Sequence, residues 1–274
     1  MQVRDLSNGN KIFVGDGVSF DDKQIVFPKN NHKGGNILFL EGNLKLNSRS
    51  LITFEGRNSV VFLGSNIHGY KVKINVCNNS AVFIGQNNFI NHPAGDPMRI
   101  LAMEETNVLI GNDGFMSTNI WLRCTDAHLI YSMDTYERIN PSRSIFIGDH
   151  VWLGQYVTLL KGTQIGSGSI VGANAVVSGK KIPSNTVWAG NPARQLKDRI
   201  FWTGQRVATW TSVEKKQHQK FVTDKYSYAR DVESLSFNEI DRQLIACQNA
   251  DDRLQYLLML SRHANKNRFA TQID

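Results

Sequence analysis

His128 is a candidate general base in this 274-residue sequence. An imidazole near its ordinary pKa can take a proton from a hydroxyl group at neutral pH. Asp126 or Glu137 could orient that ring, and the indole N–H of Trp152 could stabilise a developing oxyanion. Each residue also has a plainer interpretation. A loop histidine is commonly a solvated side chain, an aspartate commonly belongs to a turn, and a surface tryptophan commonly lies in a subunit interface.

Cationic side chains surround His128 and could bind an acidic partner. Arg123, Arg138 and Arg143 lie near it in the sequence, and a guanidinium binds a carboxylate through two parallel hydrogen bonds. The formal net charge of +7 also indicates an acidic partner. Lys and Arg are spread along the chain without a nucleic-acid-binding motif, so an anionic sugar or a phosphorylated cofactor is favoured over nucleic acid. The alternative interpretation, in which the basic residues form only a solvated surface, is also retained.

The segment after these residues has a period of six, which predicts the scaffold that positions them. Five consecutive hexads run from Ile147 to Val176, and each opens on Ile, Leu or Val. Gly is second in four of the five, and Val, Thr, Ser or Ala is fifth in all of them. Neither a helix nor an alternating strand explains this period. Stacked triangular coils explain it, because three hexads close one coil and bury a column of aliphatic side chains.

A shorter phrase, a large apolar residue followed by an aliphatic residue and Gly, predicts further coils upstream. Its copies begin 21, 26 and 37 residues apart, at Phe62, Phe83, Leu109 and Phe146. We therefore expect a β-helix domain over 1–194, with a lead-in over about 1–36 and the first coil near Asn36. The largest surplus between copies predicts a loop insertion over about 124–144, which carries His128. Loops on a rigid repeat are common positions for function.

After Pro192 the period of six stops, and residues 195–274 are expected to be a helical region. One helical face would carry Phe237, Ile240, Leu244 and Ile245. A second helix starting near Asp251 would carry Leu254, Leu257, Leu258, Met259 and Leu260. Ser234 or Ser236 could cap the first helix, with Glu239 completing a capping box. The apolar stripe of these helices could pack on the solenoid flank, join subunits or cover the open end of the solenoid. We favour the last position, because an uncovered end would expose strand edges.

The composition favours a cytoplasmic protein. Hydrophobic residues make up 41% of the chain, which is enough for a core. A membrane span needs roughly 18 or more apolar residues in a row, and the sequence has no such run. The polar start from Met1 to Asn10 argues against an export signal. Cys77, Cys124 and Cys247 lack metal-site or redox spacing and are expected to be inert thiols.

The hexads and the phrase that follows them resemble a known family. After the last hexad and a Pro-containing turn come Ala189-Gly190-Asn191-Pro192-Ala193-Arg194. This combination resembles the left-handed β-helix acyltransferases, specifically the sugar O-acetyltransferases, over roughly Ile37 to Arg194. Hexads alone occur in any hexapeptide solenoid, whereas hexads with this closing phrase are specific. The resemblance implies a mainly β, left-handed parallel β-helix that uses acetyl-CoA as co-substrate and no metal.

A second resemblance concerns the chemistry. Maltose- and galactoside-type members of the family place a catalytic His in a loop 24 residues before a Trp, and His128 precedes Trp152 by that number. The wider phrases, Asp126 to Ser132, Arg138 to Pro141 and Ile147 to Gln155, look closest to bacterial sialic acid and polysialic acid O-acetyltransferases. Those enzymes modify sialic acid of the capsule or of lipooligosaccharide. The resemblance thus implies acetyl transfer to a surface-sugar hydroxyl, with His128 as the base and no covalent enzyme intermediate.

The same resemblance implies a coenzyme A site and an oligomer. Backbone groups of Gly154, Gly172 and Ala173 would bond the amides of pantetheine. Basic residues would face the phosphates at Lys180, Lys181 and Arg194. The sialic acid carboxylate would be held by Arg123, Arg138 and Arg143. Family members form homotrimers with active sites between adjacent solenoids, so His128 and the cofactor face would come from different chains.

Other functions stay open at this stage. The γ-type carbonic anhydrases share the solenoid and hold zinc with three His. His92 and His128 suit that interpretation, but the partner expected five residues after His128 is Met133. A non-catalytic scaffold, or transfer of acetyl to an amine, would also be compatible with the repeats. An acceptor screen separates these functions.

Overall fold

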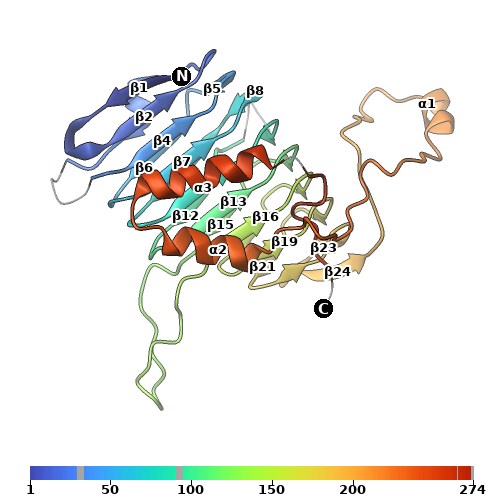
Figure 1. The fold of residues 1–274 in the computed structure, drawn as a ribbon. Helices are drawn as coiled ribbons and strands as arrows, with labels where there is room; N and C mark the ends of the chain where they lie inside the picture. Colours follow the sequence, from blue (N-terminus) through green and yellow to red (C-terminus); the bar gives the residue numbers. More distant parts are fainter. Residues whose placement is uncertain (30–33, 91–94, 264, 273–274) are drawn as a thin grey trace.

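The structure is a computed structural model that describes residues 1–29, 34–90, 95–263 and 265–272. It is a left-handed parallel β-helix whose coils stack in one direction, with two helices lying along one side (Figure 1). Strands from successive coils form three faces, called here the first, second and third sheets. Two short 3-10 helices, Ser7–Gly9 and Asp22–Gln24, lie near the N-terminus.

The first sheet runs the whole length of the solenoid. Its strands, in spatial order, are β1 (Gln2–Asp5), β2 (Lys11–Val14), β4 (Ile37–Leu40), β7 (Val60–Leu63), β10 (Ala81–Ile84), β13 (Asn107–Ile110), β16 (Ile145–Ile147), β19 (Gln164–Ile165) and β22 (Lys181–Ile182). The repeated phrase lies in register here, because Phe62, Phe83, Leu109 and Phe146 pair from strand to strand. The prediction that this phrase marks successive coils is confirmed.

The other two faces are built in the same way. The second sheet consists of β11 (Phe89–Ile90), β14 (Phe115–Met116), β17 (Trp152–Leu153), β20 (Ile170–Val171), β23 (Val187–Ala189) and β24 (Arg194–Lys197), with the pair β5 (Leu44–Leu46) and β8 (Asn66–Tyr70) next to β11. The third sheet consists of β3 (Ile25–Val26), β6 (Leu51–Phe54), β9 (Val72–Val76), β12 (Met98–Ala102), β15 (Trp121–Arg123), β18 (Thr158–Leu160) and β21 (Val176–Ser178).

The hexad pattern determines which side chains fill the interior. The residues that open the five hexads are all fully buried, namely Ile147, Leu153, Leu159, Ile165 and Val171. The fifth-position residues turn in beside them and are also fully buried: Val151, Val157, Thr163, Ser169 and Ala175. Every third hexad returns to the same face, so each buried residue stacks on an equivalent one in the next coil. Burial of this column is the main stabilising term of the solenoid.

The solenoid begins earlier than the sequence indicated. β2 pairs in parallel with β4, with Lys11 opposite Ile37, and β3 pairs in parallel with β6. The expected first coil near Asn36 was therefore wrong, because residues 11–26 already form a coil with a different loop length. At the other end β24 crosses the boundary expected at residue 194, since it pairs with β23 as part of the second sheet.

The two long helices pack on the flank of the solenoid. α2 (Phe237–Ala246) and α3 (Ala250–Arg262) lie across the outer surface of the first sheet (Figure 1). Stacked rings of that sheet meet them, with centroids 4.7 Å apart for Phe39 and Phe62 and 5.4 Å apart for Phe146 and Phe237. The prediction that these helices cover the open end of the solenoid was therefore wrong. Antiparallel strands β1 and β24 pair there with the outermost parallel strands.

Details of the helical region also differ from expectation. Ile245 and Met259 are exposed, whereas Phe237, Ile240, Leu244, Leu254, Leu257 and Leu260 are buried. Ser236 is the N-cap residue of α2, but its side chain makes no capping hydrogen bond. Residues 236–246, which the structure describes, therefore lack the expected capping box with Glu239. Much of 198–236 is irregular, and α1 (Ser212–Gln217) stands away from the solenoid (Figure 1).

A buried ion pair joins the C-terminal segment to the solenoid. The guanidinium of Arg268 donates two hydrogen bonds, of 2.8 and 2.7 Å, to the two carboxylate oxygens of Asp149. It also donates to the backbone oxygens of Leu260 and His263, both at 3.0 Å. Asp149 accepts a further bond from the backbone N–H of Asn112. A buried guanidinium with this many partners holds the end of α3 and residues 265–272 against the coil that carries β17.

Replacing Arg268 by methionine should lower the free energy of unfolding by about 3–5 kcal/mol, because it leaves the buried Asp149 carboxylate without its cation. Urea unfolding followed by circular dichroism measures the change. Arg262→Met removes an exposed cation from the same segment and is the matched control. Equal stability of the two variants would contradict the assigned role of the ion pair.

Candidate active site

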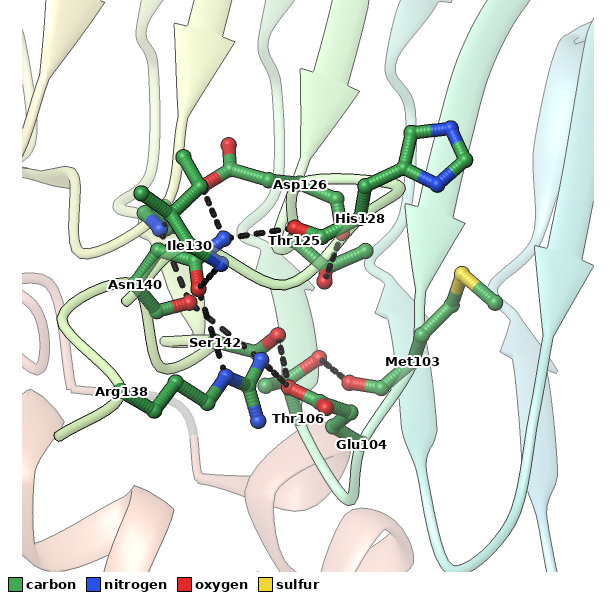
Figure 2. Close-up of polar contacts among 11 residues, drawn as sticks. Met103, Glu104, Thr106, Thr125, Asp126, His128, Ile130, Arg138, Asn140 and Ser142 are labelled. Atoms are coloured by element: carbon green, nitrogen blue, oxygen red, sulfur yellow. Dashed lines mark hydrogen bonds and ion pairs between the residues drawn. The ribbon is translucent and has the colours of Figure 1, made fainter. Parts of the chain in front are cut away.

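His128 lies in a long loop that projects from the solenoid. This loop, residues 124–144, leaves the third sheet after β15 and returns to the first sheet at β16 (Figure 1). An antiparallel bridge between Tyr131 and Arg138 closes its outer part. The side chain of His128 is exposed, and its imidazole points away from the hydrogen-bonded cluster at the base of the loop (Figure 2). A ring placed in this way is accessible to a substrate.

The buried side chain of Asn140 holds the two arms of the loop together. Its amide nitrogen donates to the backbone oxygen of His128 at 2.8 Å and to the Asp126 carboxylate at 3.1 Å (Figure 2). Its amide oxygen accepts from the backbone N–H of Ile130 at 2.9 Å. These bonds bracket His128 and fix the backbone from which the imidazole projects. Asn140 is a positioning residue that the sequence analysis did not identify.

Asp126 serves the loop rather than the imidazole. Its carboxylate accepts a 2.6 Å hydrogen bond from the ammonium group of Lys161 on the neighbouring coil. The hydrogen bonds from Lys161 and Asn140 lower the pKa of Asp126, so this carboxylate is ionised at neutral pH. In Figure 2 the imidazole of His128 extends to the opposite side from this carboxylate. The prediction that Asp126 orients His128 is therefore not supported within one chain.

The three arginines expected to bind a substrate carboxylate point to different surroundings. Arg138 donates to Glu104 at 2.8 Å, and bonds from Arg138 and Ser142 lower the pKa of Glu104 to about 2. Arg138 thus already binds a carboxylate of its own chain. Arg123 lies over the ring of Trp121 on the third sheet, 5.6 Å from its centroid. Arg143 is exposed beside Gly162.

Trp152 and His128 lie on different parts of one chain. Trp152 is the first residue of β17, and its ring is on the outer surface of the second sheet, 38% exposed. The neighbouring residue Leu153 is fully buried, which confirms that the hexad turns Trp152 outward. The loop of His128 leaves the corner between the third and first sheets, whereas Trp152 lies on the second. One chain therefore does not bring these two side chains to a common face.

Gly154, Gly172 and Ala173 do come together, at the corner between the second and third sheets. A Cβ atom added to Gly154 would lie 2.5 Å from the Ala173 nitrogen, so only glycine allows this approach. The N–H groups of Gly154 and Gly172 donate to Val171 and Trp188 within the solenoid and are not available to a ligand. Among the described backbone pairs, the N–H of Ala173 has no carbonyl partner, and Ala173 is an exposed residue.

The basic residues of the expected phosphate site are not gathered in one place. Lys180 and Lys181 lie at the corner leading into β22 of the first sheet, and Lys181 faces a cavity beside α2. Arg194 begins β24 on the second sheet, opposite Ala189. All three side chains are at least partly exposed. A phosphate group could meet Arg194 or the lysine pair, but the geometry of one chain does not unite them.

A second cluster that the sequence analysis missed lies next to Trp152. The imidazole of His150 stacks between Trp202 and Tyr226, with ring centroids 3.9 and 4.6 Å away. The indole N–H of Trp202 donates to the backbone oxygen of His150 at 3.0 Å. Burial lowers the pKa of His150 and keeps the ring neutral. His150 therefore has a structural role, and its partner Trp202 has its ring centroid 5.8 Å from that of Trp152.

Across residues 1–29, 34–90, 95–263 and 265–272, no group of three or more His, Cys, Asp or Glu side chains is arranged to hold a metal ion. His92, considered for a zinc site, lies outside the described residues. Cys124 is fully buried, and burial raises its pKa to about 12, so its thiol is inert. In the described parts of the chain, no helix has the length and apolar character to cross a membrane.

Comparisons with known proteins agree with the β-helix fold. Residues 144–179 match the family of the bacterial transferase hexapeptide (six repeats). The chain is 31% identical over 167 residues to a polysialic acid O-acetyltransferase of Neisseria meningitidis, a match covering 61% of this chain and 75% of that protein. It is 39% identical over 113 residues to a polysialic acid O-acetyltransferase of Escherichia coli O1:K1 / APEC, covering 41% of this chain.

That second match spans 36% of the length of the Escherichia coli protein. Among solved structures, the polySia-specific acetyltransferase NeuO superposes with a TM-score of 0.61 at 27% identity. This superposition covers 81% of the chain and 91% of NeuO. The similarity extends over the solenoid and beyond the segment matched by the hexapeptide family.

Replacing Asn140 by alanine should loosen the His128 loop while the solenoid stays folded, because the bonds to Ile130 and His128 are lost. We expect amide hydrogen exchange in residues 125–140 to accelerate by about tenfold, as for the loss of one to two kcal/mol of local stability. Mass spectrometry of peptic fragments measures this exchange. Asp134→Ala at the exposed tip of the loop is the control. Unchanged protection in Asn140→Ala would show that the loop is held by other contacts.

Proposed function

Because the chain belongs to the hexapeptide-repeat acetyltransferases, the family of the bacterial polysialic acid O-acetyltransferases, we propose that it transfers acetyl from acetyl-CoA to a sugar hydroxyl. The acceptor in this proposal is sialic acid or polysialic acid of a bacterial capsule or lipooligosaccharide. The observation that carries the proposal is an exposed His128 held by a buried Asn140 on the longest loop of the solenoid. Use of acetyl-CoA places the proposed reaction in the cytoplasm.

In the proposed reaction the imidazole of His128 acts as a general base. A sugar hydroxyl is a weak nucleophile at neutral pH, so it must lose its proton to the imidazole as its oxygen attacks the thioester carbonyl. A C–O bond forms and a tetrahedral oxyanion results. The C–S bond then breaks, and the imidazolium returns the proton to the departing sulfur, so that coenzyme A leaves as the thiol. No covalent bond to the protein forms in this sequence of steps.

Donors for the oxyanion are available on the second sheet and its corner. The indole N–H of Trp152 and the backbone N–H of Ala173, which has no carbonyl partner among the described backbone pairs, are two such groups. A donor aimed at the developing charge typically contributes more to the rate than to substrate binding. The glycine-lined corner at Gly154 and Gly172 lets an extended pantetheine arm lie close to the backbone. Arg194, Lys180 and Lys181 are the proposed partners of the phosphates.

The proposed site needs two copies of the chain. Since His128 and Trp152 lie on different faces of one solenoid, the third sheet and loop of one copy would face the second sheet of another. A closed ring of such contacts is a cyclic oligomer, and a homotrimer fits three-sided coils. Arg123 and Trp121 lie on the third sheet at the base of the loop, where Arg123 could bind the sialic acid carboxylate. Arg138 is a weaker candidate because it already binds Glu104.

His128→Ala should lower acetyl transfer by roughly two to four orders of magnitude while acetyl-CoA binding persists, because only the proton acceptor is removed. Release of free thiol and the mass of the acetylated sugar are measured with sialylated and neutral acceptors. His218→Ala, an exposed histidine after α1, is the control. Near-normal turnover by His128→Ala would remove the general-base assignment. Activity on neutral sugars alone would remove the sialic acid acceptor and leave acetyl transfer intact.

Mixed oligomers test whether the site is shared between chains. His128→Ala and Trp152→Ala should each be nearly inactive alone. When the two are co-expressed in equal amounts, about a quarter of the sites in a cyclic oligomer receive both intact side chains and recover activity. Differently tagged subunits and tandem purification isolate the mixed species. If mixed oligomers are as inactive as the parents, the two side chains do not act in one site built from neighbouring chains.

A further inference from the structure

A row of aromatic rings runs along the outside of the second sheet and ends at Trp152. The rings come from successive coils, with His68 against Phe89 at 5.3 Å and Phe89 stacked on Phe115 at 4.8 Å between centroids. Phe115 then meets Trp152 edge to face at 6.0 Å. This spacing follows from the separation of neighbouring strands. The row therefore extends parallel to the solenoid axis, away from the proposed reaction site.

The segment after β24 folds over this row and turns it into one side of a groove. Asn185 anchors the segment at two points, because its amide nitrogen donates to the backbone oxygens of Ile200 and Tyr226 at 2.7 and 2.8 Å. Its amide oxygen accepts from the backbone N–H of Tyr228 at 2.7 Å. The stack of His150 between Trp202 and Tyr226 closes the groove at its inner end. The volume of this open groove is about 700 Å³.

Polar and charged groups lie around the rings. Arg206 and Lys225 line the groove from the C-terminal segment, and both side chains are exposed. Asn87 and Asp113 line it from corners of the solenoid. Burial raises the pKa of Asp113. Among the residues that line the groove, two cations, Arg206 and Lys225, face one acidic residue, Asp113.

We propose that this groove binds a chain of carboxylate-bearing sugars and delivers one of its residues to Trp152. Ring faces contact the apolar side of a sugar ring, guanidinium and ammonium groups bind its carboxylate, and amide and carboxyl groups bond its hydroxyls. A row of equivalent rings at successive coils suits a ligand that is itself a repeat. The volume is within the range of small-molecule sites, so several sugar residues would extend beyond it along the sheet.

This inference rests on the proposed function, since it concerns the acceptor of the same reaction. It makes a separate claim, which is that affinity depends on acceptor length. A single sugar would occupy only the reaction site, whereas a longer chain would also occupy the groove. Removing groove cations should therefore weaken binding of long acceptors and leave the monomer unaffected.

The test compares sialic acid with a sialic acid oligomer of about ten residues, each titrated into the full-length protein by calorimetry. The double variant R206A/K225A should bind the oligomer about tenfold more weakly or worse, as expected for loss of two charge-assisted contacts, and should acetylate monomeric acceptor at the normal rate. The double variant K215A/K216A removes the same charge from α1 and is the control. Equal affinity of R206A/K225A and this control for the oligomer would overturn the proposal that the groove binds the sugar chain.

Two further readouts keep the outcomes separate. Phe89→Leu retains an apolar side chain but removes a ring face, so it should weaken oligomer binding without changing the oligomeric state measured by light scattering. If it dissociates the protein instead, the row is an interface between copies and the proposal fails. If the wild-type protein transfers acetyl only to neutral sugars and binds no sialic acid oligomer, the proposed acceptor fails together with the groove.

Discussion

The rest of the structure depends on the burial of one aliphatic residue at the start of every hexad. Ile147, Leu153 and Leu159 open successive sides of one coil, and each is fully buried. Since these residues must stack on equivalents in the next coil, the spacing of every outward-facing side chain is also determined. The ring rows of Phe39 and Phe62 on one face and Phe89 and Phe115 on another are direct results. Inner packing thus arranges the outer surfaces on which helices and ligands can lie.

Features that follow from this period were predictable from the sequence. The hexads and the phrase at Phe62 and Phe146 predicted the fold, the coil equivalences and the loop that carries His128. The first coil was missed because its strands, β2 and β3, are joined by a loop that hides the period. The position of α2 and α3 was missed for another reason. The outward rings of the first sheet resemble core residues in sequence, so nothing distinguished a flank that needs covering from an interior.

The side-chain contacts of the site were not predictable in the same way. Asn140 and Lys161 act through bonds to residues 12 and 35 positions away in the chain, and no period relates them. Asp126 is close to His128 in the sequence, yet its carboxylate binds Lys161 of the neighbouring coil. Glu104 likewise engages Arg138, a residue assigned to the substrate from sequence alone. Neighbouring residues on a loop can face opposite ways, and only the fold shows which partner each one meets.

The ion pair between Arg268 and Asp149 also affects how the chain can fold. The coils of a solenoid are local structures, and each can form once its neighbour in the sequence is present. The carboxylate of Asp149 finds its cation only 119 residues later. Contacts between neighbouring coils are local, whereas this ion pair is a contact of high sequence separation, and closing so long a loop is entropically slow. Completion of the coil that bears Trp152 thus waits for the distal segment, which links maturation of that face to synthesis of the C-terminal region.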